Sequence, residues 1–137
     1  MNQTKKIGIV VSIFEEYPID FAYIFGSSIK QEVGPLSDVD LAVYFNSKIP
    51  QYDRHKNRLD LISRLESIFT PVKVDLIVLN DSNYLLADEI MRTGQCIVDK
   101  KPRVKQQFTE YIITRSLDFK PFANKFDKWQ YESINQE

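Results

Sequence analysis

Two aspartates flank a single valine at the start of an apolar segment. Asp38 and Asp40 are separated by Val39, and apolar residues continue to residue 45. In a β-strand, residues two apart project from the same face of the sheet, so both carboxylates face the same way. Two anions crowded on one face of a sheet destabilise the fold unless another group compensates their charge. Because Mg²⁺ prefers hard oxygen ligands, the pair predicts a divalent metal site.

A third carboxylate is available further along the chain. Asp75 is the only acid in the apolar segment from residue 72 to residue 79. If this segment forms a strand beside the strand of Asp38 and Asp40, the three acids complete one site. Three acids can hold two metal ions about 3.5–4 Å apart, an arrangement that stabilises the attacking and leaving oxygens in phosphoryl transfer. We therefore predict that all three are metal ligands and catalytic residues.

A glycine and a serine precede this cluster. Gly26 and Ser27 follow the aromatic and β-branched segment from residue 19 to residue 25, where a strand is expected to end. Glycine allows a sharp turn, and the free N–H groups at the start of a following helix form an anion site. By itself the junction is weak evidence of phosphate binding, and the nearby carboxylates strengthen it.

The positions of these residues depend on the elements that carry them. Apolar spacing predicts four strands and four longer helices, with one or two helical turns over 27–33. The predicted strands cover 19–25, 38–45, 72–79 and 96–98. The predicted helices cover 7–17, 54–69, the segment from 81 or 82 to the C-cap Gly94, and the segment from Pro102 onward with a break near Pro121. The buried stripe expected on the second helix consists of Leu59, Ile62, Leu65, Ile68 and Phe69. The fold class is therefore α/β or α+β, a small mixed sheet with helices packed on one face.

Composition limits the size and the compartment of the protein. The chain has 137 residues, of which 43% are hydrophobic and 27% charged, and this balance is typical of one globular domain rather than a disordered chain. The single Cys96 excludes an internal disulfide and a cysteine zinc site. No apolar run reaches the ~20 residues of a membrane span. We expect a cytoplasmic protein that does not bind membranes.

Charge is balanced overall but differs between the two parts of the chain. The 18 basic and 19 acidic residues give no overall nucleic-acid signature, so direct nucleic-acid binding is not expected. Residues 1–99 hold 10 basic and 14 acidic residues, whereas residues 100–137 hold 8 and 5. Within a single domain of residues 1–137, we expect a catalytic core over 1–100 and a helical tail over 101–137. The basic tail is either a solvated helix face or a surface that reaches phosphate or an acidic partner.

The spacing of the chemical residues resembles a known signature. Gly26-Ser27, ten further residues and Asp38-Val39-Asp40 are similar to the GS-x10-DxD signature of the DNA polymerase β-type nucleotidyltransferase superfamily, and Asp75 matches its third carboxylate. In length and local sequence, the chain looks most like the minimal nucleotidyltransferase (MNT) domains. These act as antitoxins beside HEPN ribonuclease toxins in prokaryotic toxin–antitoxin pairs. The tail segment 117–122 also resembles the C-terminal helix region of such antitoxins.

The resemblance implies an activity and a role for each residue. It implies a polymerase β palm-like fold and a Mg²⁺-dependent transfer of AMP from ATP to a tyrosine hydroxyl of a HEPN-type toxin. Asp38 and Asp40 would hold the metals, with two Mg²⁺ ions expected, and Gly26 and Ser27 would contact the phosphates of the nucleotide. Asp75 would bind one metal and help to deprotonate the acceptor hydroxyl.

One position departs from the family pattern, and two other functions stay open. Lys30 stands where many relatives have an arginine, so it keeps a positive charge for the nucleotide but loses the bidentate fork. One alternative is an antitoxin that acts by binding alone. The other is a nucleotidyltransferase that modifies a small antibiotic, although such enzymes usually carry an extra domain or large loops. Because 137 residues leave little room to enclose an acceptor, we expect the acceptor to be another folded protein.

Overall fold

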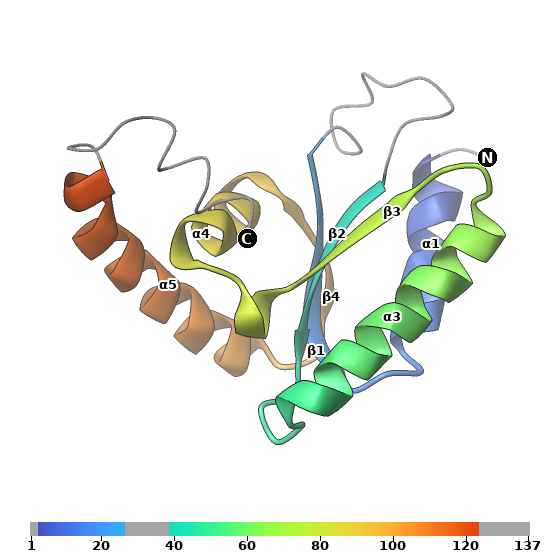
Figure 1. The fold of residues 1–137 in the computed structure, drawn as a ribbon, viewed down its shortest axis with the longest axis horizontal. Coiled ribbons are helices and arrows are strands. Elements are labelled where there is room, and N and C mark those ends of the chain that lie inside the picture. Colours follow the sequence, from blue (N-terminus) through green and yellow to red (C-terminus); the bar gives the residue numbers. More distant parts are fainter. Residues whose placement is uncertain (1–2, 27–38, 124–137) are drawn as a thin grey trace.

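The computed structural model describes residues 3–26 and 39–123, which form one sheet with helices around it (Figure 1). The predicted turns over 27–33 and the residue Asp38 lie outside these ranges. In chain order the elements are α1 (Gln3–Phe14), β1 (Ile19–Phe25), β2 (Val39–Phe45), α3 (Gln51–Ile68), β3 (Val74–Val78), the short 3₁₀ helix η1 (Leu79–Asp81), α4 (Tyr84–Thr93), β4 (Gln95–Asp99) and α5 (Pro102–Ala123). No helix within these ranges is long and apolar enough to cross a bilayer.

The four strands form one mixed sheet in the order β3-β2-β1-β4. β1 pairs antiparallel with both β2 and β4, and β2 pairs parallel with β3. The prediction of a small mixed sheet is therefore confirmed. β4 is an edge strand, as expected, and is longer than the predicted segment 96–98.

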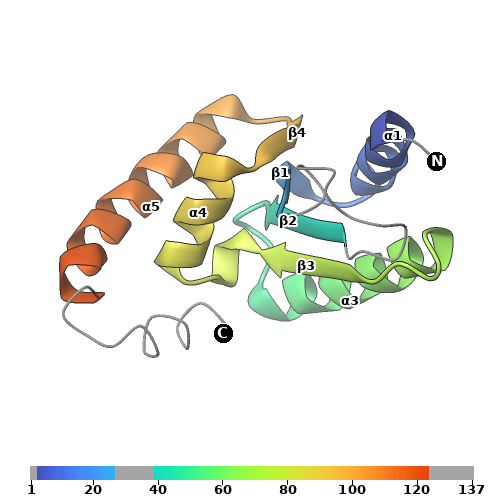
Figure 2. The ribbon, with the colours of Figure 1, turned by 90° about the horizontal axis from the view of Figure 1, so that it is seen from above.

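Helices cover both faces of the sheet, whereas the sequence predicted helices on one face. α1 and α3 lie against one face, and α4 and α5 lie against the other (Figures 1 and 2). The physical reason lies in β1, whose residues are all buried except Phe25, which is partly buried. A strand that is apolar on both sides must be covered on both sides.

The buried face of α3 matches the predicted stripe only in part. Leu65 and Phe69 are buried as predicted, but Leu61 is fully buried in addition, whereas Leu59 and Ile68 are 52% and 45% exposed. Arg58 lies within the angular range of the buried residues, and its Nε donates to the carbonyl oxygen of Leu76 at 2.8 Å. This hydrogen bond lets an arginine occupy a position that the hydrophobic pattern reserves for an apolar residue.

The ends of α4 and the length of α5 follow from local contacts. The N-cap of α4 is Asn83, whose side chain accepts a hydrogen bond from the backbone N–H of Leu86 at 2.9 Å, rather than the expected Asp81 or Ser82. Gly94 is the C-cap of α4, as predicted. α5 continues through Pro121 to Ala123, past the expected break.

Candidate functional site

The C-terminal end of β1 and the N-terminal ends of β2 and β3 lie side by side at one end of the sheet. In the antiparallel pair, Phe25 at the end of β1 is the Cα partner of Asp40 near the start of β2. In the parallel pair, Asp40 is the Cα partner of Asp75 near the start of β3. The neighbouring strands that the three-carboxylate prediction requires are therefore present for Asp40 and Asp75, and Gly26 directly follows at the same edge.

The carboxylates of Asp40 and Asp75 lie on the face of the sheet that α4 and α5 cover. Two residues further along each strand, Ala42 and Ile77 belong to the apolar cluster on that face. Asp75 is exposed and Asp40 is partly exposed, so both can be reached from solvent. Two neighbouring carboxylates concentrate negative charge, and their oxygens are the hard ligands that suit Mg²⁺. The donor set that is present therefore fits a divalent cation.

Gly26 is held close to Asp40. Its backbone has φ of 70°, in the left-handed region that favours glycine. A Cβ atom built on Gly26 would overlap the Oδ2 atom of Asp40 and would lie 3.2 Å from its Cγ. The absence of a side chain at residue 26 is thus what allows the end of β1 to lie against the Asp40 carboxylate.

The other predicted site residues cannot be placed. Ser27, Lys30 and Asp38 lie outside the described residues, so the phosphate-binding half of the prediction and one of its three acids stay predictions. Residues 3–26 and 39–123 contain no group of three His, Cys, Asp or Glu side chains that could hold a metal ion. The predicted metal site needs Asp38 in addition to Asp40 and Asp75.

The C-terminus of α4 borders the same edge of the sheet. A Cβ atom on Gly94 would lie 2.5 Å from the carbonyl oxygen of Ile90 and 3.0 Å from that of Ile24, and 3.3 Å from Cβ of Phe25. Sequence reasoning gave Gly94 only the role of a helix cap. The structure adds a packing role, since the glycine brings α4 close to the end of β1.

Tyr44 lies away from the carboxylates, although the sequence suggested that it could border their pocket. It follows Asp40 by four residues on β2, and its ring stacks on Phe21 with a centroid separation of 4.7 Å and also contacts Phe108. Burial raises the pKa of the Tyr44 phenol. Its surroundings are those of a packing residue.

The opposite end of the sheet is closed by paired polar groups. Arg54 contacts Asp81 through two hydrogen bonds of 2.6 and 3.0 Å and donates a third, of 2.7 Å, to the carbonyl oxygen of Ile49. The hydrogen bonds to Asp81 raise the pKa of Arg54. Asn80 exchanges two 2.9 Å hydrogen bonds with the backbone of Phe45. These contacts fasten α3 and the segment after β3 to the end of β2.

Comparison with protein families gives one match over most of the chain. The family model described as "Polymerase beta, Nucleotidyltransferase" matches residues 9–103, which include Gly26, Asp40 and Asp75. A comparison with curated protein sequences gave no significant match.

Several solved structures of similar fold come from toxin–antitoxin complexes. A chain in the crystal structure of the toxin–antitoxin MntA–HepT has a TM-score of 0.66 and 16% identity, with 89% of this chain and 97% of that chain covered. A chain in the structure of the tri-AMPylated Shewanella oneidensis HEPN toxin in complex with MNT antitoxin has a TM-score of 0.68 and 16% identity, covering 90% and 98%. A chain in a toxin–antitoxin structure with AMP-PNP has a TM-score of 0.69 and 18% identity, covering 91% and 98%. At these identities the likeness shows the fold.

Proposed function

Because the chain belongs to the polymerase beta nucleotidyltransferase family, we propose that it transfers AMP from ATP to a tyrosine hydroxyl of a HEPN-type toxin and so acts as the antitoxin. One observation carries the catalytic part of this proposal. Asp40 and Asp75 are Cα partners on neighbouring parallel strands, on one face, at the strand end where Gly26 packs against the Asp40 carboxylate.

Asp38, Asp40 and Asp75 would hold the Mg²⁺ ions. When bound, the metal neutralises phosphate charge and acts as a Lewis acid. The role of the protein is then to position the reacting groups, since nucleotidyl transfer requires little covalent chemistry from side chains. Gly26, Ser27 and Lys30 would contact the nucleotide at the end of β1, where a residue with a side chain at position 26 would collide with Asp40.

The proposed step is an in-line displacement. The tyrosine oxygen of the acceptor attacks the α-phosphorus of ATP, and a new oxygen–phosphorus bond forms. The bond between the α-phosphorus and its bridging oxygen breaks, and pyrophosphate leaves with that oxygen. The phenolic proton passes to the carboxylate of Asp75, which is exposed and can be approached by an acceptor on another protein.

The identity of the acceptor is supported by the solved relatives. Chains of the same fold occur in complexes with a HEPN toxin, one of which is tri-AMPylated, and one related complex holds AMP-PNP. We assign residues 1–100 to the catalytic core and residues 101–137 to a tail within one domain, and we place the protein in the cytoplasm.

Mass spectrometry of the partner tests the proposal. A purified HEPN-type protein from the same organism would be incubated with the chain, ATP and MgCl₂, and its intact mass measured. We expect a gain of one or more AMP units, which EDTA and the Asp40→Asn substitution should abolish. Asp53→Asn is the matched control, because Asp53 is an exposed aspartate on α3, across the sheet.

The alternatives predict different results. A partner that is bound and neutralised without any gain in mass would support an antitoxin that acts by binding alone. Transfer of AMP to an aminoglycoside or lincosamide, with none to the partner, would support a small-molecule nucleotidyltransferase. Either result would overturn the proposed acceptor.

A further inference from the structure

Asp75 lies on a strand at the edge of the sheet. β3 is the first strand in the order β3-β2-β1-β4, so within the described residues β2 is its only neighbour in the sheet. The backbone N–H of Val39 donates to the carbonyl oxygen of Lys73 at 2.9 Å. Successive residues of a strand turn their backbone groups to alternate sides, so the backbone groups of Lys73 and Asp75 face β2. The backbone groups of Val74 and Leu76 therefore face away from β2 and need partners outside the sheet.

Two charged side chains of α3 bond to these outer backbone groups. Nε of Arg58 donates to the carbonyl oxygen of Leu76 at 2.8 Å. Oε2 of Glu66 accepts from the backbone N–H of Val74 at 3.0 Å. Hydrogen bonds that involve an ionised group are roughly twice as strong as those between neutral groups. Because Val74 and Leu76 directly precede and follow Asp75, α3 holds the backbone on both sides of this acid.

The position of the Asp75 carboxylate depends on its own backbone. The side chains of Val74 and Leu76 are buried in the apolar cluster that α1 and α3 cover, whereas the side chain of Asp75 is exposed. An exposed side chain is not fixed by packing around it. The distance between the Asp75 and Asp40 carboxylates is therefore set by where β3 lies against β2.

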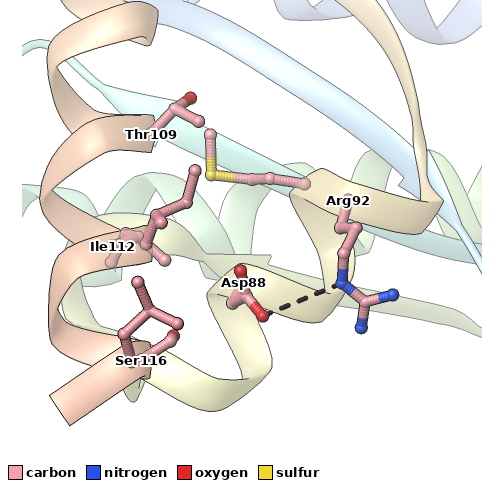
Figure 3. A pocket seen from close by; sticks show the side chains of 8 residues that line it. Asp88, Arg92, Thr109, Ile112 and Ser116 are labelled. Atoms are coloured by element: carbon pink, nitrogen blue, oxygen red, sulfur yellow. Dashed lines mark ion pairs between the residues drawn. The ribbon is translucent and has the colours of Figure 1, made fainter.

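Two other arginines make their contacts away from β3. In the pocket between α4 and α5, Nε of Arg92 lies 3.8 Å from Oδ2 of Asp88, four residues earlier on the same helix (Figure 3). Arg64 lies on α3, as Arg58 does, and donates to the Glu16 carboxylate at 3.1 and 3.2 Å and to Oη of Tyr17 at 3.2 Å. Arg64 and Arg92 therefore provide matched control positions.

We propose that Arg58 and Glu66 are positioning residues for AMP transfer, because they hold β3 so that the Asp75 carboxylate stays beside that of Asp40. This inference rests on the proposed function, in which both acids hold Mg²⁺. Arg58 and Glu66 act through the backbone, from a helix that covers the opposite face of the sheet. Loss of a group that orients a metal ligand typically costs about 10–100-fold in metal affinity or activity.

Binding of Mn²⁺ to the full-length chain tests this role without catalysis. Free Mn²⁺ would be measured by electron paramagnetic resonance at a temperature at which circular dichroism shows each variant folded. We expect Arg58→Met and Glu66→Met each to weaken Mn²⁺ binding about 10-fold. Arg64→Met and Arg92→Met should bind Mn²⁺ like the wild type, although Arg64→Met also removes hydrogen bonds of α3.

A conservative variant and a measurement on the metal-free chain separate positioning from general stability. The amide oxygen of Glu66→Gln can still accept from the Val74 N–H, so its Mn²⁺ affinity should stay close to that of the wild type. Amide hydrogen exchange at Asp75 should be faster in Arg58→Met than in Arg64→Met, because only the first loosens the edge strand.

The outcomes distinguish this inference from the proposed function. Wild-type Mn²⁺ affinity in both Arg58→Met and Glu66→Met would overturn the positioning role and leave the proposed function standing. An equal loss of affinity in Arg64→Met would also overturn it, because the effect would then be one of general stability. If Mn²⁺ binding depends on Arg58 and the wild type transfers no AMP, the proposed function is wrong and the positioning of the metal ligands stands. A wild-type chain that binds no Mn²⁺ would overturn both.

Discussion

The two ends of the sheet use charge in opposite ways. At one end, β2 and β3 place the carboxylates of Asp40 and Asp75 next to each other. At the other end, Arg54 and Asp81 form an ion pair, and the side chain of Asn80 hydrogen-bonds to the backbone N–H and carbonyl of Phe45. Both ends are built by the same two strands and the segments that follow them.

The paired charges at one end stabilise the fold, whereas the two carboxylates at the other end are suited to binding a cation. Pairing an arginine with a carboxylate satisfies both groups within the protein. Placing like charges side by side is unfavourable for the isolated fold and becomes favourable when a cation binds. Local departures from the rules of stability are expected at functional sites, and the carboxylate end is where this sheet departs from them.

Removing a charge from the carboxylate end should have the largest effect, and on catalysis rather than stability. Asp75→Asn is expected to lower the rate of AMP transfer at least about 1,000-fold, or about 4 kcal/mol, because the proposed metal ligand and proton acceptor is lost. The free energy of unfolding in urea should stay the same or rise by roughly 0.5 kcal/mol, because like-charge repulsion is relieved.

The matched control is the same substitution at the opposite end. Asp81→Asn removes the partner of Arg54, so it should destabilise the protein and leave the transfer rate of the folded protein unchanged. If Asp75→Asn destabilised the protein as much as Asp81→Asn does, the contrast between the two ends would be wrong.

Removing the arginine of the Arg54–Asp81 pair should have a smaller effect, and only on the free energy of unfolding. Arg54→Met removes the hydrogen bonds to Asp81 and to the Ile49 carbonyl, and hydrogen bonds to charged groups contribute roughly 1.5–3 kcal/mol. Urea denaturation should report a loss of this size. Arg103→Met, an exposed arginine in the first turns of α5, should change stability little. An Arg54→Met variant as stable as the wild type would contradict the structural role of this pair.

Adding one methyl group at Gly26 should destabilise the protein somewhat less than Arg54→Met does. Gly26→Ala should cost about 1–2 kcal/mol, because alanine is strained at a positive φ. It should also reduce AMP transfer, because the new Cβ displaces the Asp40 carboxylate. The control Gly8→Ala lies on α1, where a Cβ meets nothing within 4 Å, and it should stabilise the helix slightly. Unchanged transfer by Gly26→Ala would show that the close approach to Asp40 has no catalytic value.

The sequence predicted β1 and β2 well, because β1 is rich in aromatic and β-branched residues and the apolar residues of β2 recur at every second position. Val39, Leu41 and Val43 are buried on the face that α1 and α3 cover, and β1 spans the predicted residues 19–25. Whether the strand of Asp75 lies beside the strand of Asp40 could not be predicted, because it depends on the order of the strands in the sheet. Periodicity in one strand does not reveal its neighbour, so only the structure could place the two acids in register.

The orientation of α3 was the least predictable feature. Its apolar residues spread around much of the helix, so several choices of buried face were possible from the sequence. The structure buries Leu61 and leaves Leu59 exposed, and Arg58 on the same side as Leu61 donates a hydrogen bond to the Leu76 carbonyl oxygen. A hydrogen bond between segments far apart in the sequence leaves no local signal. The predicted roles of Ser27, Lys30 and Asp38 remain predictions.

The alternation of β3 ties the chemistry to the core. Leu76 is fully buried on one face and Asp75 stands on the other, one residue away. A slip of β3 by one residue against β2 would turn Leu76 to the opposite face and drive the Asp75 carboxylate into the apolar cluster around Leu61. The same alternation that keeps Leu76 in the core therefore keeps Asp75 on the face of the sheet that carries Asp40.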